Sequence, residues 1–233
     1  MKNNYVDLSD ASIYTAFKES EKIINASVRN INDKMLCRLH SKSKEAVDKY
    51  FDKDNYPFKE SEFLRHLPKL DIGGFDHGNM SQLYNKFQTD VRYKNTRLKG
   101  WKQLFSLIPR NLLTNENLLI LDFLAGSGTL ARKAKQLWKN RSPNVIGIDV
   151  SYKMCEAAFH NNEIVFCGSH DNNYFKKGIA DIVIVAYGLH HLQVTERVQF
   201  VQSCKRTLKG GGLCILHDFE SSFTTAKWYT QLT

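Results

Sequence analysis

The sequence has 233 residues, of which 42% are hydrophobic and 24% charged, and its formal net charge is +9. This length suits one packed core with a smaller appended region, and the longest apolar runs, such as residues 182–187, are too short to cross a bilayer. The N-terminus has no apolar secretory stretch, and the five scattered cysteines form no CxxC pair. We therefore expect a cytoplasmic protein with reduced thiols and no metal site.

Residues 1–115 are predicted to be mainly helical. Apolar side chains recur near helical spacing over residues 10–28 and 33–51, and two shorter helices are expected over residues 81–88 and 96–108. We expect residues 1–115 to form a helical N-terminal region, followed by a core over residues 116–233.

The most basic stretch of the chain lies at the end of this region. Residues 91–115 contain six Lys or Arg residues and no acidic one, with Tyr93 and Trp101 among them. Basic and aromatic side chains together are typical of nucleic-acid contacts. Apolar residues from Trp101 to Ile108 recur at i, i+3, i+4 and i+7, which instead favours a helix with a solvated basic face. We prefer the second interpretation.

From residue 117 short apolar runs alternate with helical segments. Strands are expected over residues 118–123, 144–150, 163–167, 181–187 and 212–217, and helices over residues 129–139, 152–161 and 194–208. This alternation predicts an α/β fold with a doubly wound, mainly parallel, Rossmann-like sheet and helices on both faces. Ligands of such sheets bind beyond the carboxyl ends of the strands.

The loop after the first strand, residues 122–129, contains two glycines. Gly126 and Gly128 allow the backbone to turn sharply and to approach a ligand closely. The helix expected from Thr129 presents its positive end to a polar or anionic group.

The next two loops carry polar side chains suited to a nucleoside. Asp149 lies 21 residues beyond Gly128, where an acidic residue would hold ribose hydroxyls. It could instead cap the following helix, although Ser151 can do so. After the third strand, Ser169 or Asp171 could accept a hydrogen bond from an adenine amine, and an ordinary polar loop is almost equally expected.

The last two loops carry histidines. His190 and His191 follow the fourth strand, where one could act as a base or orient a substrate, or else pack and cap the next helix. Adjacent histidines on a turn do not favour a metal site. His217 and Asp218 follow the fifth strand and could form a general-base pair or a structural one.

These loops, in this order, resemble the motifs of class I S-adenosylmethionine-dependent methyltransferases. Residues 121–129 look like the first motif, 147–154 like the second, 181–192 like the fourth, and 208–212 like the turn before the fifth strand. The resemblance covers about residues 117–219 and implies S-adenosylmethionine as cofactor. The ending of the fourth motif is similar to the small-molecule branch. Residues 186–189 lack the Pro-Pro motif of enzymes that methylate base amines.

The resemblance also implies roles for individual residues. The expected cofactor-binding residues are Tyr84, Asp122, Leu124, Ala125, Gly126, Gly128, Asp149, Val150, Met154, Ser169, His170, Asp171, Tyr187 and Gly188. The expected catalytic residues are His190, His191 and His217, and the expected substrate-binding residues are Arg92, Arg97 and Asp218. Leu124 departs from the family, which has a glycine at that place.

The resemblance implies in-line methyl transfer to an oxygen or nitrogen of a small molecule, with residues 1–115 as a lid or substrate-recognition element. Alternatives are a lyase or cyclase that releases methylthioadenosine, an RNA methyltransferase or nucleic-acid binder using residues 92–110, and an inactive partner subunit. Strands six and seven of the family are not found after residue 217. An open sheet edge would favour a homodimer.

Overall fold

The computed structural model describes residues 33–52, 54, 91–138, 143–161, 163–169 and 174–218. The helices expected over residues 10–28 and 81–88 lie outside these residues, as do Tyr84, His170 and Asp171. Whether residues 1–115 form a separate unit stays a prediction. None of the described helices is both long enough and apolar enough to cross a membrane.

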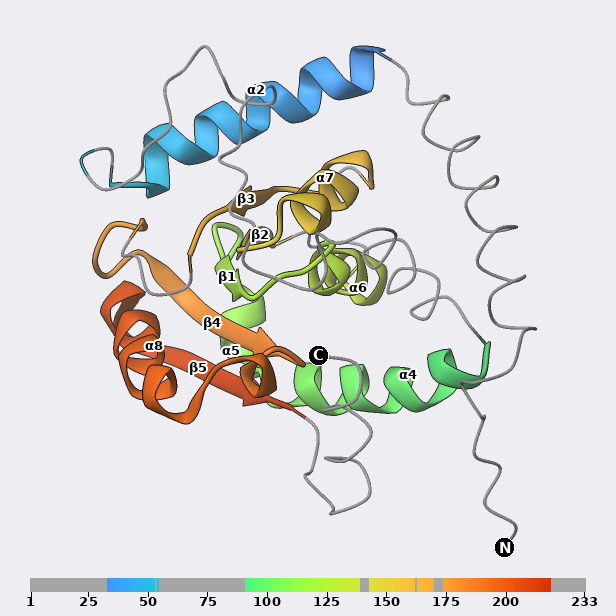
Figure 1. The fold of residues 1–233 in the computed structure, drawn as a ribbon, viewed down its shortest axis with the longest axis vertical. Helices are drawn as coiled ribbons and strands as arrows, with labels where there is room; N and C mark the ends of the chain where they lie inside the picture. The colour runs from blue at the N-terminus through green and yellow to red at the C-terminus, as the bar shows by residue number, and fades with distance from the viewer. Residues whose placement is uncertain are drawn as a thin grey trace, which may run out of the picture.

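Five parallel strands form one sheet in the order β3-β2-β1-β4-β5, which confirms the predicted doubly wound fold (Figure 1). The strands are β1 (Leu119–Phe123), β2 (Asn144–Asp149), β3 (Val165–Cys167), β4 (Ala180–Ala186) and β5 (Leu208–His217). The order reverses between β1 and β4, so their carboxyl ends flank the crevice in which ligands of such sheets bind. Among the described residues the sheet ends at β5.

Two strands differ from the sequence-based expectation by more than one residue at one end. The third strand begins at Val165 because Glu163 still donates its backbone N–H to Ala158 of the preceding helix. The fifth strand begins at Leu208, which pairs with Ala180, and the register then shifts before Leu213 pairs with Ile182. The glycine run that looked like a turn is therefore mostly extended.

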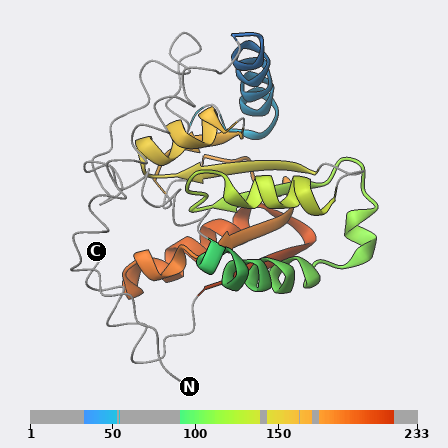
Figure 2. The same ribbon diagram turned by 90° about the vertical axis from the view of Figure 1, so that its right-hand side faces the viewer.

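Helices connect the strands and cover both faces of the sheet. They are α2 (Asp33–Tyr50), α4 (Val91–Ser106), α5 (Arg110–Leu113), α6 (Thr129–Leu137), α7 (Tyr152–His160) and α8 (Val194–Thr207), with a short 3₁₀ helix, η3 (Leu189–His191). Helix α4 begins five residues earlier than expected, since no proline or glycine interrupts residues 91–99. Figures 1 and 2 show α2 and α4 on opposite sides of the sheet.

Alternating strand residues fill the two cores. In β1, Leu119 and Leu121 pack with Phe200 of α8, whereas Ile120 packs on the other face with Trp101 of α4 and Leu130 of α6. Strands that are buried on both faces explain the continuous apolar runs in the sequence.

The C-terminal end of α2 is attached to the segment between β3 and β4. Phe51 is fully buried and forms an antiparallel bridge with Phe175. The Asp52 N–H donates to the Tyr174 carbonyl at 2.7 Å. Lys176 Nζ donates to the Asp48 and Lys49 carbonyls at 3.3 and 3.0 Å, where a cation is favourable at a helix end.

Candidate functional site

The glycine loop turns away from β1 through three residues with positive φ. Leu124, Gly126 and Gly128 have φ angles of 59°, 55° and 73°. A Cβ added to Gly126 would meet no atom within 4 Å, whereas one on Gly128 would lie 2.8 Å from the Glu163 Cβ. Gly126 therefore leaves open space for a ligand, and Gly128 is required for packing against the end of the loop after α7.

Asp149 joins the glycine loop to the end of β2. Its Oδ2 accepts the Gly126 N–H at 2.7 Å, and its Oδ1 accepts the Ser151 N–H at 2.9 Å. The Ser151 hydroxyl accepts the Met154 N–H at 3.2 Å and thereby caps α7. Each carboxylate oxygen can accept a further hydrogen bond. Ribose binding by Asp149 stays a prediction that this geometry permits.

Other predicted cofactor residues surround this junction. Asp122, near the end of β1, is buried, and burial together with the neighbouring Asp149 raises its pKa well above the ordinary value of an aspartate. Ala125 and Met154 are buried and Val150 is half-buried. The Ser169 N–H donates to the Tyr174 hydroxyl at 3.2 Å. The structure thus brings the loops after β1, β2 and β3 together.

Residues from the ends of β1 and β4 touch across the crevice. A Cβ added to Gly188 would lie 2.7 Å from the Leu124 Cβ, so the leucine packs directly on the glycine. Leu124 and Tyr187, both with φ of 59°, are the two non-glycine residues with positive φ in the described part of the chain. Bulky residues adopt this conformation only where the surroundings hold them in it.

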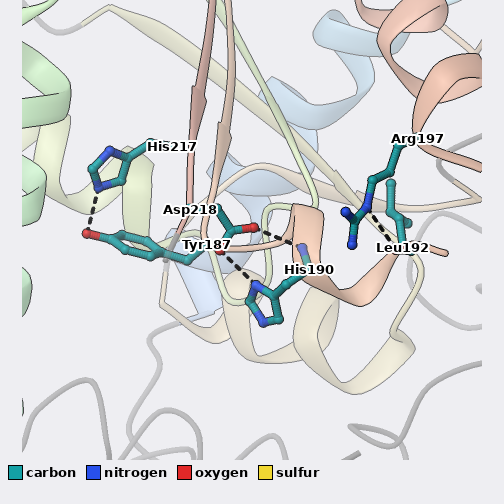
Figure 3. Close-up of polar contacts among 6 residues, drawn as sticks. All are labelled: Tyr187, His190, Leu192, Arg197, His217 and Asp218. Atoms are coloured by element: carbon teal, nitrogen blue, oxygen red, sulfur yellow. Dashed lines mark hydrogen bonds and ion pairs between the residues drawn. The ribbon is translucent and has the colours of Figure 1, made fainter. Parts of the chain in front are cut away.

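The histidines at this edge form two separate pairs, on opposite sides of the end of β5 (Figure 3). His217 Nε2 lies 3.0 Å from the Tyr187 hydroxyl, and the Tyr187 N–H donates to the His217 carbonyl at 2.7 Å. His190 Nδ1 lies 2.8 Å from Asp218 Oδ1, while the His190 N–H donates to Asp218 Oδ2 at 2.9 Å. His217, the last residue of β5, and Asp218, which follows it, pair with different residues, because consecutive residues of an extended backbone point to opposite sides.

His191 differs from its neighbour. Its ring centroid lies 4.1 Å from that of His190, and part of the residue is exposed to solvent. Partial desolvation of the ring and the nearby His190 lower the pKa of His191 to about 4, although Asp218 acts in the opposite direction. His191 is therefore a neutral and weakly basic imidazole at pH 7.

The turn that carries these histidines is anchored to α8. Arg197 Nε donates to the Leu192 carbonyl at 3.1 Å, as Figure 3 shows. Gln193 and Glu196 form a reciprocal capping box at the start of α8. The Gln-x-x-Glu spacing could have been found in the sequence, whereas the Arg197 contact could not, because no pattern links that side chain to a carbonyl.

Two further supports of the glycine loop were missed by sequence reasoning. Arg132 donates to the Ser127 carbonyl at 2.6 Å and to the Thr129 hydroxyl at 2.9 Å. Lys135 forms a 2.6 Å ion pair with the buried carboxylate of Glu163. Arg132 thus fixes the start of α6 to the loop, and Lys135 joins the last turn of α6 to Glu163, which packs against Gly128.

The predicted substrate arginines lie on α4. The structure places Arg92 and Arg97 in this helix, but their side chains are outside the described part, so their role stays a prediction. Lys102 and Arg110 are exposed. Among the described residues no group of three or more His, Cys, Asp or Glu side chains could hold a metal ion.

Comparisons with known proteins agree with this geometry. A family model described as "Methyltransferase domain" matches residues 120–212. No curated protein matches the sequence. Among solved structures, the PH0226 protein of Pyrococcus horikoshii is 19% identical with a TM-score of 0.50, and the match covers 65% of this chain and 67% of that one.

Two further solved structures are similar. A SAM-dependent methyltransferase of Thermotoga maritima is 19% identical over 61% of this chain, with a TM-score of 0.48, and the match spans 58% of the length of that relative. A Haloferax volcanii methyltransferase, in complex with the activator Trm112, is 20% identical with a TM-score of 0.48, over 64% of this chain and 66% of that one. Residues 120–212 therefore match a methyltransferase domain on a Rossmann-like fold, which implies S-adenosylmethionine as the cofactor.

Proposed function

We propose that the protein transfers a methyl group to an oxygen or nitrogen of a small molecule, with His190 as the general base. The observation that carries this proposal is the pairing of His190 with Asp218, beside Gly188 and at the carboxyl ends of β4 and β5. The acceptor would lie at this edge, next to the cofactor.

The residues at the β1–β4 crevice fit the cofactor. Gly126 leaves open space at the start of α6, and the Asp149 carboxylate has acceptor capacity for ribose hydroxyls. We propose that Asp122 and Gly188 contact the methionine part. S-adenosylmethionine, when bound, supplies an activated methyl group, so the protein's main task is to align the acceptor and exclude water.

Asp218 makes His190 suitable as a base. With Nδ1–H donating to Asp218 Oδ1, the ring carries its basic lone pair on Nε2, and this nitrogen is buried. As the acceptor loses its O–H or N–H proton to Nε2, the Asp218 carboxylate stabilises the imidazolium that forms. His191, with its pKa lowered to about 4, is a poor competitor for that proton.

Location and partners belong to the same proposal. Four cysteines in the described part are free thiols, which is consistent with a cytoplasmic enzyme. Leu216 of β5 is 46% exposed at the outer strand of the described sheet. We therefore propose that two copies of the chain pair through this strand, and that a small molecule is the other partner.

The reaction can be tested without knowing the acceptor. The full chain is incubated with S-adenosylmethionine alone, or together with a pool of phenols, amines and imidazoles, and the products are identified by mass spectrometry. We expect S-adenosylhomocysteine to form only in the presence of the pool, and His190→Gln to lower its rate of formation about 100-fold or more. Equal rates in the wild type and in His190→Gln would rule out His190 as the general base.

The same experiment distinguishes methyl transfer from the main alternative, cleavage of the cofactor itself. A lyase or cyclase on this fold would release methylthioadenosine from S-adenosylmethionine alone. Its appearance without acceptor would replace methyl transfer by cofactor cleavage as the function of this site.

A further inference from the structure

We propose that Tyr187, His217 and Gly100 form a positioning unit that holds the end of β4 in the shape that the cofactor requires. This inference rests on the proposed function of the same site. It assigns His217 a role in positioning Tyr187, in place of the base expected from the sequence, and gives helix α4 a defined contact with the site.

The conformation of Tyr187 needs an explanation. Its φ of 59° lies in the left-handed region, which bulky residues rarely adopt. Such a conformation persists only where neighbouring contacts determine it, and it is found most often at functional sites. Tyr187 directly precedes Gly188, which packs on Leu124 of the glycine loop. The backbone at Tyr187 therefore sets how the ends of β4 and β1 meet.

His217 holds Tyr187 by both its main chain and its side chain. The Tyr187 N–H donates to the His217 carbonyl at 2.7 Å, and the hydroxyl lies 3.0 Å from Nε2. Tyr187 is 8% exposed, and its ring meets the Trp101 ring edge-on, with centroids 5.4 Å apart. These contacts fix the phenol against α4, and Figure 3 shows it directed away from the His190–Asp218 pair.

Gly100 provides the space for this phenol. It lies inside α4, where glycine is unfavourable compared with alanine. A Cβ added there would overlap the Tyr187 hydroxyl and would lie 3.3 Å from His217 Nε2. The hydroxyl cannot simply swing aside, since His217 and Trp101 hold it. An alanine at this position would therefore push Tyr187, and with it Gly188, out of place.

A double-mutant cycle tests whether Gly100 acts on the site through the Tyr187 hydroxyl. Gly100→Ala is made in the wild-type and in the Tyr187→Phe background, which lacks the hydroxyl but keeps the ring. Affinity for S-adenosylhomocysteine is measured by calorimetry, and thermal unfolding is followed in parallel. We expect Gly100→Ala to weaken binding about tenfold in the wild-type background and less than about twofold in Tyr187→Phe. We also expect it to lower the Tm of the first much more than that of the second, because without the hydroxyl the added Cβ meets only the ring carbon Cζ and His217 Nε2, each at 3.3 Å.

Two variants serve as controls. Gly210→Ala, at a glycine whose added Cβ would meet no atom within 4 Å, should change neither binding nor Tm appreciably. His217→Gln keeps a side chain able to bond the hydroxyl and should restore most of the affinity that His217→Ala loses.

The outcomes distinguish this inference from the proposed function. Equal effects of Gly100→Ala on binding in the two backgrounds would overturn it, and so would a change in Tm with affinity intact. A wild-type protein that binds no S-adenosylhomocysteine, while Tm still shows the coupling, would instead refute the cofactor site on which both proposals depend.

Discussion

At the residue scale, the buried carboxyl of Asp122 lowers the stability of the fold at neutral pH. The residue lies near the end of β1, beside the proposed cofactor site. Burial first, and Asp149 second, raise the pKa of this carboxyl, so that ionisation is more difficult in the folded chain than in the unfolded one. The contribution of Asp122 to stability is fully present below the ordinary aspartate pKa of about 4, and it is lost as pH rises through the raised value.

Asp122→Asn should therefore stabilise the fold at neutral pH. The amide has the same shape and cannot ionise, so the Tm difference from wild type should be smallest near pH 4 and should grow as pH rises. The same substitution should weaken S-adenosylmethionine binding if Asp122 contacts the cofactor. Thermal unfolding across pH 4–8, with calorimetric titration at pH 7, measures both effects. A variant less stable than wild type at pH 7 would contradict the first expectation.

A second substitution at this scale concerns the proton on His190. In Asp218→Asn the amide N–H₂ can donate to Nδ1, which would move the ring proton to Nε2 and block the base. We expect kcat to fall about 100-fold or more, with affinity for S-adenosylhomocysteine nearly unchanged. Steady-state kinetics with the acceptor identified from the pool provides the measurement. Unchanged kcat would show that Asp218 does not act through the histidine.

At the scale of elements, Phe51 anchors the C-terminal end of α2 to the core. Phe51 is completely buried and packs against the rings of Phe166 and Phe175, at centroid distances of 4.6 and 4.5 Å. Removing such a ring from a core leaves a cavity as well as losing burial.

Phe51→Ala should lower the free energy of unfolding by about 3–5 kcal/mol. Glu45→Ala, at an exposed position of the same helix, should change it by less than about 0.5 kcal/mol. Denaturant unfolding followed by circular dichroism compares the two. Similar small effects would mean that the end of α2 contributes little to the stability of the core.

The elements show what a sequence can and cannot predict. Apolar runs identified all five strands, and the Gly126–Gly128 turn and Asp149 identified where two of them end, because period and spacing are local properties. The pairing of His190 with Asp218, and of His217 with Tyr187, depends on which strand ends meet and on which side each residue points. Nothing in the sequence indicated that residue 100 must be a glycine, because the side chain that requires it, Tyr187, lies far along the chain.

At the scale of the whole molecule, the net positive charge should attract polyanions such as RNA. It does not identify the acceptor of the methyl group. The net charge is +9, and Lys99, Lys102 and Arg110 are exposed on and near α4. Binding through such side chains releases counterions and weakens steeply with salt.

We expect weak binding to duplex RNA at low salt that falls about tenfold or more between 50 and 200 mM salt, without methylation of the RNA. Fluorescence anisotropy with a labelled duplex measures the binding, and a mass shift of the RNA would report methylation. Lys99→Glu together with Lys102→Glu should reduce the binding and its salt dependence. Methylated RNA would favour the nucleic-acid function over a small-molecule acceptor.

The contact between the end of α2 and the segment that precedes β4 affects how the chain folds during its synthesis. Lys176 closes on Asp48 across 128 residues of sequence. A ribosome adding about 5–20 residues per second needs on the order of ten seconds to supply the second partner after the first. During that interval Phe51 has no ring to meet, so its surface is open to chaperones or to other nascent chains. Contacts of such long range also form late and slow the search for the native state.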